Sequence, residues 1–406
     1  MKLLAEIIGL IVAAVLIIIT ALAAGPPAPA HILGGAGDQS QRKLTYYISE
    51  RTLRELSILS NGQSLEDFLA PLFRGWRRIK GPPPPAVDFI FGMTHGLEGR
   101  LYPVKAVLKY RTDMSLIDDK VNFHAVVAAA GLGQHIAETY EIADSNNATN
   151  STNNAASSAN TYTPAEIFER GFGPWIVRAN FGYSGSANTV VTNASDMTAA
   201  AARFYNNNQT KEIKVHPSNG PAILPRVIAS KYIDDPMLWR GHKFHARVIL
   251  LVLITPTRRI AAIVPPTKLI SSALPYKKGD YSNNKLHDTH ASTVGIPVSN
   301  LDTMTKLPGR LMVEKTTVAL REICPVIMPL IKTYPEAENS YDFLGVDVMY
   351  QPDATPVILE MNALPGIKTT SEERILSVFQ LASSIFKQPD WENVCPGLII
   401  VYDKCS

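Results

Sequence analysis

The stretch that decides the fold is Asp342-Phe-Leu-Gly-Val-Asp347-Val-Met-Tyr350, then Gln351-Pro-Asp-Ala-Thr-Pro356, then Val357-Ile-Leu-Glu360-Met-Asn362. Both arms are rich in β-branched and aromatic residues, and the segment between them contains the proline and aspartate typical of turns. The stretch therefore predicts a β-hairpin with polar side chains at a few positions of two otherwise apolar strands.

The polar positions of this hairpin predict a metal site. If Tyr350 lies opposite Val357, counting back along the ladder places Asp347 opposite Glu360. Asn362 follows Glu360 by two residues and projects from the same face. Facing carboxylates repel unless a positive charge lies between them, and carboxylate and amide oxygens are hard ligands of the kind that bind Mg²⁺. A solvated acidic face is the alternative, and the surrounding apolar residues count against it.

Basic residues and glycines earlier in the chain predict phosphate binding. Trp175-Ile-Val-Arg178 leads into a loop containing Gly182 and Gly185, whose backbone N–H groups can approach a phosphate closely. In Lys243-Phe-His245-Ala-Arg247 the polar residues alternate and share one face of a strand. A face with two cations fits a triphosphate pocket.

These blocks, in this order, resemble those of the tubulin–tyrosine ligase-like family in the ATP-grasp superfamily. The Arg178 strand resembles the family's phosphate-covering strand, and Lys231-Tyr-Ile-Asp-Asp-Pro-Met-Leu resembles its hinge. Leu286-His-Asp-Thr-His290 is similar to a short polar loop of the nucleotide site. The hairpin end, Glu360-x-Asn362-x-x-Pro365-Gly366, resembles the closing strands. The resemblance covers residues 120–370.

The resemblance implies an α/β (α+β) ATP-grasp fold, with the nucleotide held between two mixed or antiparallel sheets. It implies ATP and Mg²⁺ as cofactors. It also implies ligation through an acyl-phosphate: ATP phosphorylates a carboxylate, and an incoming amine displaces the phosphate. The implied partners are ATP, a free amino acid and an acidic protein acceptor such as a tubulin tail. A formal net charge of +3 gives no indication of nucleic-acid binding.

The resemblance also implies roles for individual residues. Catalytic roles fall to Lys243, Arg247 and Glu360, and metal binding falls to Asp347, Glu360 and Asn362. The nucleotide-binding set consists of Arg178, Gly182, Gly185, Ser230, Lys231, Tyr232, Ile233, Lys243, His245, His287, Thr289 and His290.

Three positions depart from the family pattern: Arg178 stands where the family usually has lysine, His245 where it has aspartate, and His290 where it has asparagine. The two histidines leave open an inactive member that binds nucleotide as a membrane-tethered module. A ligase with a small-molecule acceptor is a second alternative. Zinc at the pairs His242/His245 and His287/His290 is disfavoured, because strand positions three apart point to opposite faces.

The N-terminal segment predicts a membrane-spanning helix or a signal peptide. Residues 7–24 carry no charge and consist mostly of Ile, Leu, Val and Ala, which reaches the lower limit for a membrane-spanning helix. Ala21-Leu-Ala23 has the pattern of a signal-peptidase site. We favour a signal anchor over a cleaved secretory signal, with the side of the membrane open.

Composition breaks predict the remaining organisation. We expect a signal segment (1–24), a linker (25–43), an N-terminal α/β lobe (44–143), a low-complexity insertion (144–161), a central ATP-grasp lobe (162–235), a C-terminal ATP-grasp lobe with the hairpin (236–395) and a tail (396–406). We also expect helices at 164–172 and 308–334, the second kinked by Pro325 and Pro329, and strands at 175–177, 187–191, 222–233 and 243–254.

Overall fold

The computed structural model describes residues 45–48, 77–79, 89–91, 104–108, 117, 119–143, 161–180, 188–208, 226–254, 258–289, 292–296, 307–331, 337–362 and 398–405. All of them belong to one compact unit, Lys43–Ser406. The hydrophobic segment 7–24, the linker 25–43 and nearly all of the insertion 144–161 lie outside these residues. Within them, no helix is long and apolar enough to cross a membrane.

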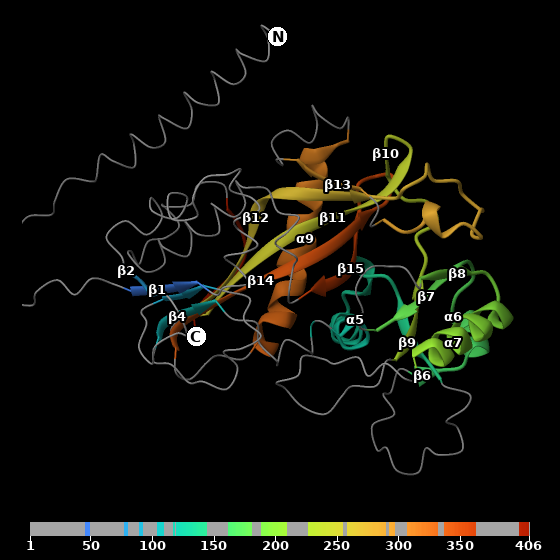
Figure 1. Cartoon of the computed structure of the whole chain (residues 1–406), viewed down its shortest axis with the longest axis horizontal. Helices are drawn as coiled ribbons and strands as arrows, with labels where there is room; N and C mark the ends of the chain where they lie inside the picture. Colours follow the sequence, from blue (N-terminus) through green and yellow to red (C-terminus); the bar gives the residue numbers. More distant parts are fainter. Residues whose placement is uncertain are drawn as a thin grey trace, which may run out of the picture. The chain divides into compact units, whose positions relative to one another are not determined.

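The strands in these ranges form two sheets, as the ATP-grasp resemblance predicts (Figure 1). The smaller sheet has five strands in the order β6-β5-β9-β7-β8. Its strands are β5 (Thr139–Ile142), β6 (Thr161–Tyr162), β7 (Trp175–Ala179), β8 (Thr189–Val191) and β9 (Val227–Lys231).

Two helices pack on the five-stranded sheet. They are α6 (Pro164–Arg170) and α7 (Ala194–Asn208). Helix α6 begins at a capping box, in which the Thr163 hydroxyl accepts from the Glu166 backbone while the Glu166 carboxylate accepts from the Thr163 N–H. The fully buried Trp175 side chain forms the centre of this core, together with Ile167 of α6 and Met197 of α7. The core anchors β7, the strand that carries Arg178.

The larger sheet has eleven strands in the described residues, with the order β13-β12-β11-β14-β4-β3-β1-β2 and three further strands, β10, β15 and β16, paired to β11, β14 and β12. Its strands are β1 (Thr45–Ile48), β2 (Arg77–Ile79), β3 (Phe89–Phe91), β4 (Val104–Leu108), β10 (Leu238–Trp239), β11 (His242–Ile254), β12 (Arg258–Ser271), β13 (Ser292–Ile296), β14 (Ala337–Tyr350), β15 (Pro356–Asn362) and β16 (Ile399–Cys405).

The middle of the larger sheet is apolar on both faces. Strand β11 runs antiparallel to both β12 and β14, and its stretch 248–254 is buried throughout. A strand covered on both faces reads as a continuous apolar run rather than an alternating one. Only the first part of β11, where Lys243 and Arg247 lie, carries polar residues, so polarity is confined to one end of the strand.

Two helices pack with this sheet. Helix α9 (Gly309–Ile327) buries Leu320 and Ile323 in the same core as β11 and β14. Pro325 lies inside α9, and the chain tightens into a short 3₁₀ turn at Met328–Leu330, close to the predicted break. Helix α5 (Lys120–Ala129) begins at its N-cap Asp119, whose side chain accepts from the Asn122 N–H.

Two expected segment boundaries differ from the observed connectivity. Strands β1 to β4 do not form a sheet of their own, because β4 pairs in parallel with β14, whereas β5 joins the five-stranded sheet through β9. The expected N-terminal lobe is thus shared between the two sheets. The expected tail contains β16, which pairs with β12 and buries Val401. Strand pairing across long stretches of sequence leaves no compositional signal.

Candidate nucleotide and metal site

The hairpin places Asp347 opposite Glu360, as predicted. The register that leads there is different: Tyr350 faces Pro356 rather than Val357, so the predicted pairing at the turn is wrong by one residue. A β-bulge at Leu359 restores the count, because Val348 pairs with Ile358 and the next pair is Asp347 with Glu360. The bulge leaves Leu359 without a ladder partner.

Asp347 is buried and already neutralised by a neighbouring strand. Arg247 lies beside it in the β11–β14 ladder. The guanidinium holds the carboxylate with two bonds: Nε donates to Oδ1, and a terminal nitrogen donates to Oδ2 at 2.7 Å. Such a bidentate pair is geometrically specific. Burial lowers the pKa of Arg247, but Asp347 outweighs it and the net shift is upward.

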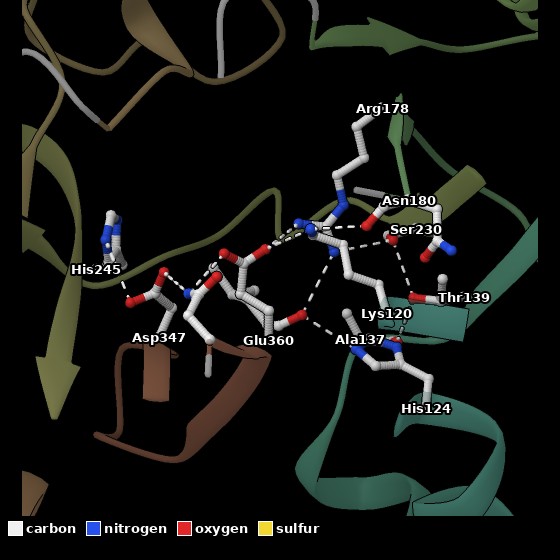
Figure 2. A network of polar contacts seen from close by, with 12 residues as sticks. Lys120, His124, Ala137, Thr139, Arg178, Asn180, Ser230, His245, Asp347 and Glu360 are labelled. Atoms are coloured by element: carbon white, nitrogen blue, oxygen red, sulfur yellow. Dashed lines mark hydrogen bonds and ion pairs between the residues drawn. The ribbon is translucent and has the colours of Figure 1, made fainter. Parts of the chain in front are cut away.

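Glu360 is neutralised by two cations from elsewhere in the chain. Its Oε2 lies 3.3 Å from Lys120 Nζ on α5 and 3.4 Å from an Arg178 terminal nitrogen on β7 (Figure 2). Its Oε1 accepts from the Asn362 amide at 2.9 Å. Burial raises the pKa of Glu360, but Lys120 and Arg178 outweigh it and hold that pKa well below its usual value. Glu360 is therefore ionised at neutral pH.

The predicted metal ligands lie together. Asn362 Nδ2 is 3.4 Å from Asp347 Oδ2 and 2.9 Å from Glu360 Oε1. Two carboxylates and an amide side chain suit Mg²⁺ in kind, and nucleotide phosphates would have to supply further oxygens. Among the described residues, no group of three or more His, Cys, Asp and Glu side chains is arranged to hold a metal.

Arg178 lies where the two sheets meet. It projects from β7, and its terminal nitrogens also reach the Ser230 hydroxyl at 3.2 Å and the Leu359 carbonyl at 3.4 Å. The Thr139 hydroxyl donates in turn to Ser230. Arg178 Nε is buried without a hydrogen-bond partner, and burial lowers the pKa of this guanidinium. One donor of a buried cation is thus left without an acceptor among the described residues.

The charges of this cluster favour an anion. Three cations, Lys120, Arg178 and Arg247, contact two carboxylates, Asp347 and Glu360. The surplus positive charge is buried, where electrostatic interactions are stronger than in water. A polyanion such as a triphosphate, or a phosphate with its metal, would balance it.

The predicted hinge and polar loop lie next to each other. His287 Nε2 lies 2.7 Å from the Asp280 carbonyl, an acceptor, so Nε2 carries the proton and Nδ1 accepts from the Tyr232 hydroxyl at 2.6 Å. Burial lowers the pKa of His287. The Lys243 ammonium donates to the Ile233 carbonyl at 2.9 Å and lies 3.6 Å from the Tyr232 ring centre. Burial holds the pKa of Lys243 well below its usual value.

His245 faces the carboxylate cluster. Its Nδ1 is 2.6 Å from the Thr289 hydroxyl, and its Nε2 is 3.7 Å from Asp347 Oδ1. His242, three residues earlier, instead contacts the Ser272 carbonyl. The two imidazoles therefore have different surroundings, as expected for opposite faces of a strand. Zinc binding by the pair His242/His245 gains no support from this arrangement.

The Lys231 side chain points away from this pocket. Its ammonium donates to the Phe172 carbonyl and lies 4.7 Å from the Trp175 ring centre. The backbone N–H groups of Lys231 and Tyr232 donate to Glu138 and Pro174. These two donors of the predicted hinge are therefore engaged within the protein, and the role of the hinge in binding adenine stays a prediction. Gly182, Gly185 and His290 lie outside the described residues.

Several residues of the cluster carry no signal in the sequence. Lys120 and His124 lie on α5, more than 230 residues before Glu360, and His124 Nε2 contacts the Leu359 carbonyl at 3.1 Å. The Asn180 carbonyl accepts from Lys120 at 2.9 Å. Lys120 is adjacent to an N-capping aspartate, but that pattern predicts a helix start and not a binding site.

Comparison with known proteins finds one matching family model. A model described as the tubulin-tyrosine ligase family matches residues 122–260. This segment is similar to the tubulin-tyrosine ligase family. It includes β7, β9 and β11 with Arg178, Ser230, Lys243 and Arg247, and it ends before the hairpin. No curated protein matches the chain significantly.

The match to the tubulin-tyrosine ligase family agrees with the two-sheet α/β architecture, which is consistent with an ATP-grasp-like fold. It indicates an ATP-dependent ligase that joins a carboxylate to an amine. The match covers about a third of the chain. Asp347 and Glu360 lie outside the matched segment. Their assignment to the site therefore depends on the geometry of the hairpin alone.

Proposed function

We propose that this protein is an ATP-dependent ligase that joins an amino acid to a protein carboxylate through an acyl-phosphate. The observation that carries the proposal is the contact between Arg178 and Glu360, which joins a basic strand of one sheet to an acidic hairpin of the other. The acidic acceptor protein and the free amino acid are part of the proposal.

The chemistry needs the positive charge of this cluster. A carboxylate is a poor electrophile, and its own charge repels both the triphosphate and the amine. Arg178 and Arg247 of this cluster, with Lys243 beside the predicted hinge, would neutralise the phosphoryl group and align it with the acceptor carboxylate. This is catalysis by positioning and electrostatics, with no protein nucleophile.

The residues present fit Mg²⁺, with Asp347, Glu360 and Asn362 as its protein ligands. When bound, the ion would supply charge neutralisation at the phosphates. Asp347 and Glu360 first have to exchange their present partners, Arg247, Lys120 and Arg178. Those cations would then be released to face the phosphates, so metal and triphosphate support each other's binding.

A ligation screen tests this proposal. The protein is incubated with Mg-ATP, isotopically labelled amino acids, glutamate-rich peptides and small carboxylic acids, and products are read by mass spectrometry. A peptide that gains the mass of an amino acid less water supports the protein acceptor. A product on small acids alone would replace the protein acceptor with a small molecule, and no product on any acceptor would contradict ligase activity.

A catalytically inactive nucleotide-binding module is the second candidate. The observation that favours it is His245, where the family pattern has aspartate: its imidazole lies 3.7 Å from Asp347, the carboxylate that Arg247 holds with two bonds. Single-turnover ADP release separates the two candidates. An inactive module binds Mg-ATP and releases no ADP, whereas the ligase forms ADP when it phosphorylates the acceptor carboxylate.

We also propose that residues 7–24 attach the protein to a membrane as a signal anchor. Their uncharged, apolar composition supports this. Alkaline carbonate extraction of the full chain, compared with a chain lacking residues 1–24, tests it. The full chain should remain with the membrane pellet, and its appearance in the supernatant would contradict an anchor.

A further inference from the structure

Helix α5 contacts strand β15 at two points one helical turn apart. Lys120 Nζ lies 3.3 Å from Glu360 Oε2 (Figure 2). His124 Nε2 lies 3.1 Å from the Leu359 carbonyl oxygen. Residues four apart share one face of a helix. One face of α5 therefore meets two consecutive residues of β15, of which the second is the predicted metal ligand.

Leu359 is the extra residue of the β-bulge. Bulges change the direction in which the neighbouring side chains project, and the bulged residue leaves the ladder. Its carbonyl needs donors from outside the ladder, because a buried carbonyl without a partner is costly. His124 at 3.1 Å and Arg178 at 3.4 Å supply them.

His124 is the donor to Leu359 when the proton of the neutral ring is on Nε2. In that tautomer the ring donates to the Leu359 carbonyl, which only accepts, and the Ala137 carbonyl also acts on the ring. The imidazole is 2% exposed. Burial, and secondarily Arg178, lower the pKa of His124 to about 4. The ring thus holds the bulge without adding charge to a cluster that already contains three cations.

We propose that His124 is a positioning residue, whose Nε2–H fixes the bulged Leu359 carbonyl and so sets the direction in which Glu360 projects toward a nucleotide-bound metal. The inference rests on the proposed function for its ligand. It assigns to α5 a part in the site that neither the hairpin nor the glycine-loop pattern predicts.

Two substitutions at one position separate this role from simple packing. His124→Gln keeps an N–H donor at a similar reach, whereas His124→Leu removes it and keeps an apolar body of similar size. His135→Gln is the matched control, because His135 follows α5 and contacts Glu322 on α9 instead. Binding of Mn²⁺ in the presence of ATP is followed by electron paramagnetic resonance, with ATP binding in EDTA and thermal unfolding measured beside it.

We expect His124→Leu to raise the Mn²⁺ dissociation constant about three- to tenfold, the effect of one lost hydrogen bond. Binding of metal-free ATP should change less. His124→Gln should stay near the parent, as should His135→Gln.

Three results would overturn the inference. Parent-like Mn²⁺ binding by His124→Leu would show that His124 does not position Glu360. Equal losses in His124→Gln and His124→Leu would show that the ring only fills space. A parent protein that binds no Mg-ATP would overturn the proposed function, and this inference with it, whereas the first two results leave the proposed function standing.

Discussion

The guanidinium of Arg178, on β7 of the five-stranded sheet, lies 3.4 Å from the carboxylate of Glu360, on β15 of the larger sheet. A triphosphate would compete with Glu360 for Arg178, and a metal ion would compete with Arg178 for Glu360. Binding both together exchanges one set of ion pairs for another. Nucleotide and metal should therefore bind cooperatively at this point.

Glu360→Gln tests the predicted metal ligand. The substitution keeps the size of the side chain and removes its charge, so the protein should fold while Mg-ATP turnover is lost. Steady-state ADP release measures turnover, and circular dichroism checks the fold. A folded variant that consumes ATP at the parental rate would remove Glu360 from the site.

Arg178→Ala and Lys243→Ala test the phosphate contacts. Each should weaken Mg-ATP binding by about 1.5–3 kcal/mol, the scale of a charge-assisted hydrogen bond. Isothermal titration calorimetry gives the values. Arg258→Ala is the control, since Arg258 forms a half-exposed pair with Asp403. If Arg178→Ala and Lys243→Ala bind as tightly as this control, the pocket lies elsewhere.

His245→Asp tests the departure from the family pattern. The new carboxylate would face Asp347, whose Oδ1 now lies 3.7 Å from the imidazole Nε2. Like charges repel, so the variant should have a lower melting temperature than the parent in the absence of metal. Mg²⁺ should then raise the melting temperature of the variant more than that of the parent. Ligase activity should be kept or raised, because aspartate is the residue usual in the family.

His245→Asn provides the uncharged comparison for that experiment. It should show the parental response to Mg²⁺ in thermal unfolding. Loss of all ligase activity in His245→Asp, with the fold intact, would mean that His245 takes part in chemistry that aspartate cannot replace.

The buried His124 predicts a pH dependence of stability. Its folded pKa is lowered to about 4 from 6.5, mainly by burial. Between these values the unfolded chain binds the extra proton, so stability falls as pH falls from about 6.5 to about 4. The loss from this group is of the order of 3 kcal/mol. Urea unfolding of the parent and of His124→Gln measures it, and parallel pH profiles would contradict it.

The hairpin shows how far the sequence leads. The β-branched and aromatic residues of each arm predict two strands, and the pairing of Asp347 with Glu360 follows, but the turn is one residue tighter than predicted. Ala354 adopts a positive φ of 66°, and the bulge at Leu359 absorbs the difference. Bulges arise from packing around the strand, here by His124 and Arg178, and nothing within the arm indicates one.

The position of Lys120 in the site could not be predicted from the sequence. Strand residues such as Lys243 and Arg247 are recognisable because alternation shows that they share a face. Lys120 enters the site only because α5 packs against β15, and long-range packing leaves no local pattern. The same reason explains why β1 to β4 extend the larger sheet instead of forming a separate lobe.

The most direct test of carboxylate activation follows oxygen from the acceptor. An acceptor peptide with ¹⁸O in its carboxylates is incubated with the protein, Mg-ATP and an amino acid, and the released phosphate is analysed by mass spectrometry. An acyl-phosphate route transfers one carboxylate oxygen to phosphate when the amine displaces it. The account predicts one ¹⁸O per phosphate with the parent and no labelled phosphate with Glu360→Gln. Phosphate that carries only the oxygens of ATP and water, while ligation proceeds, would contradict it.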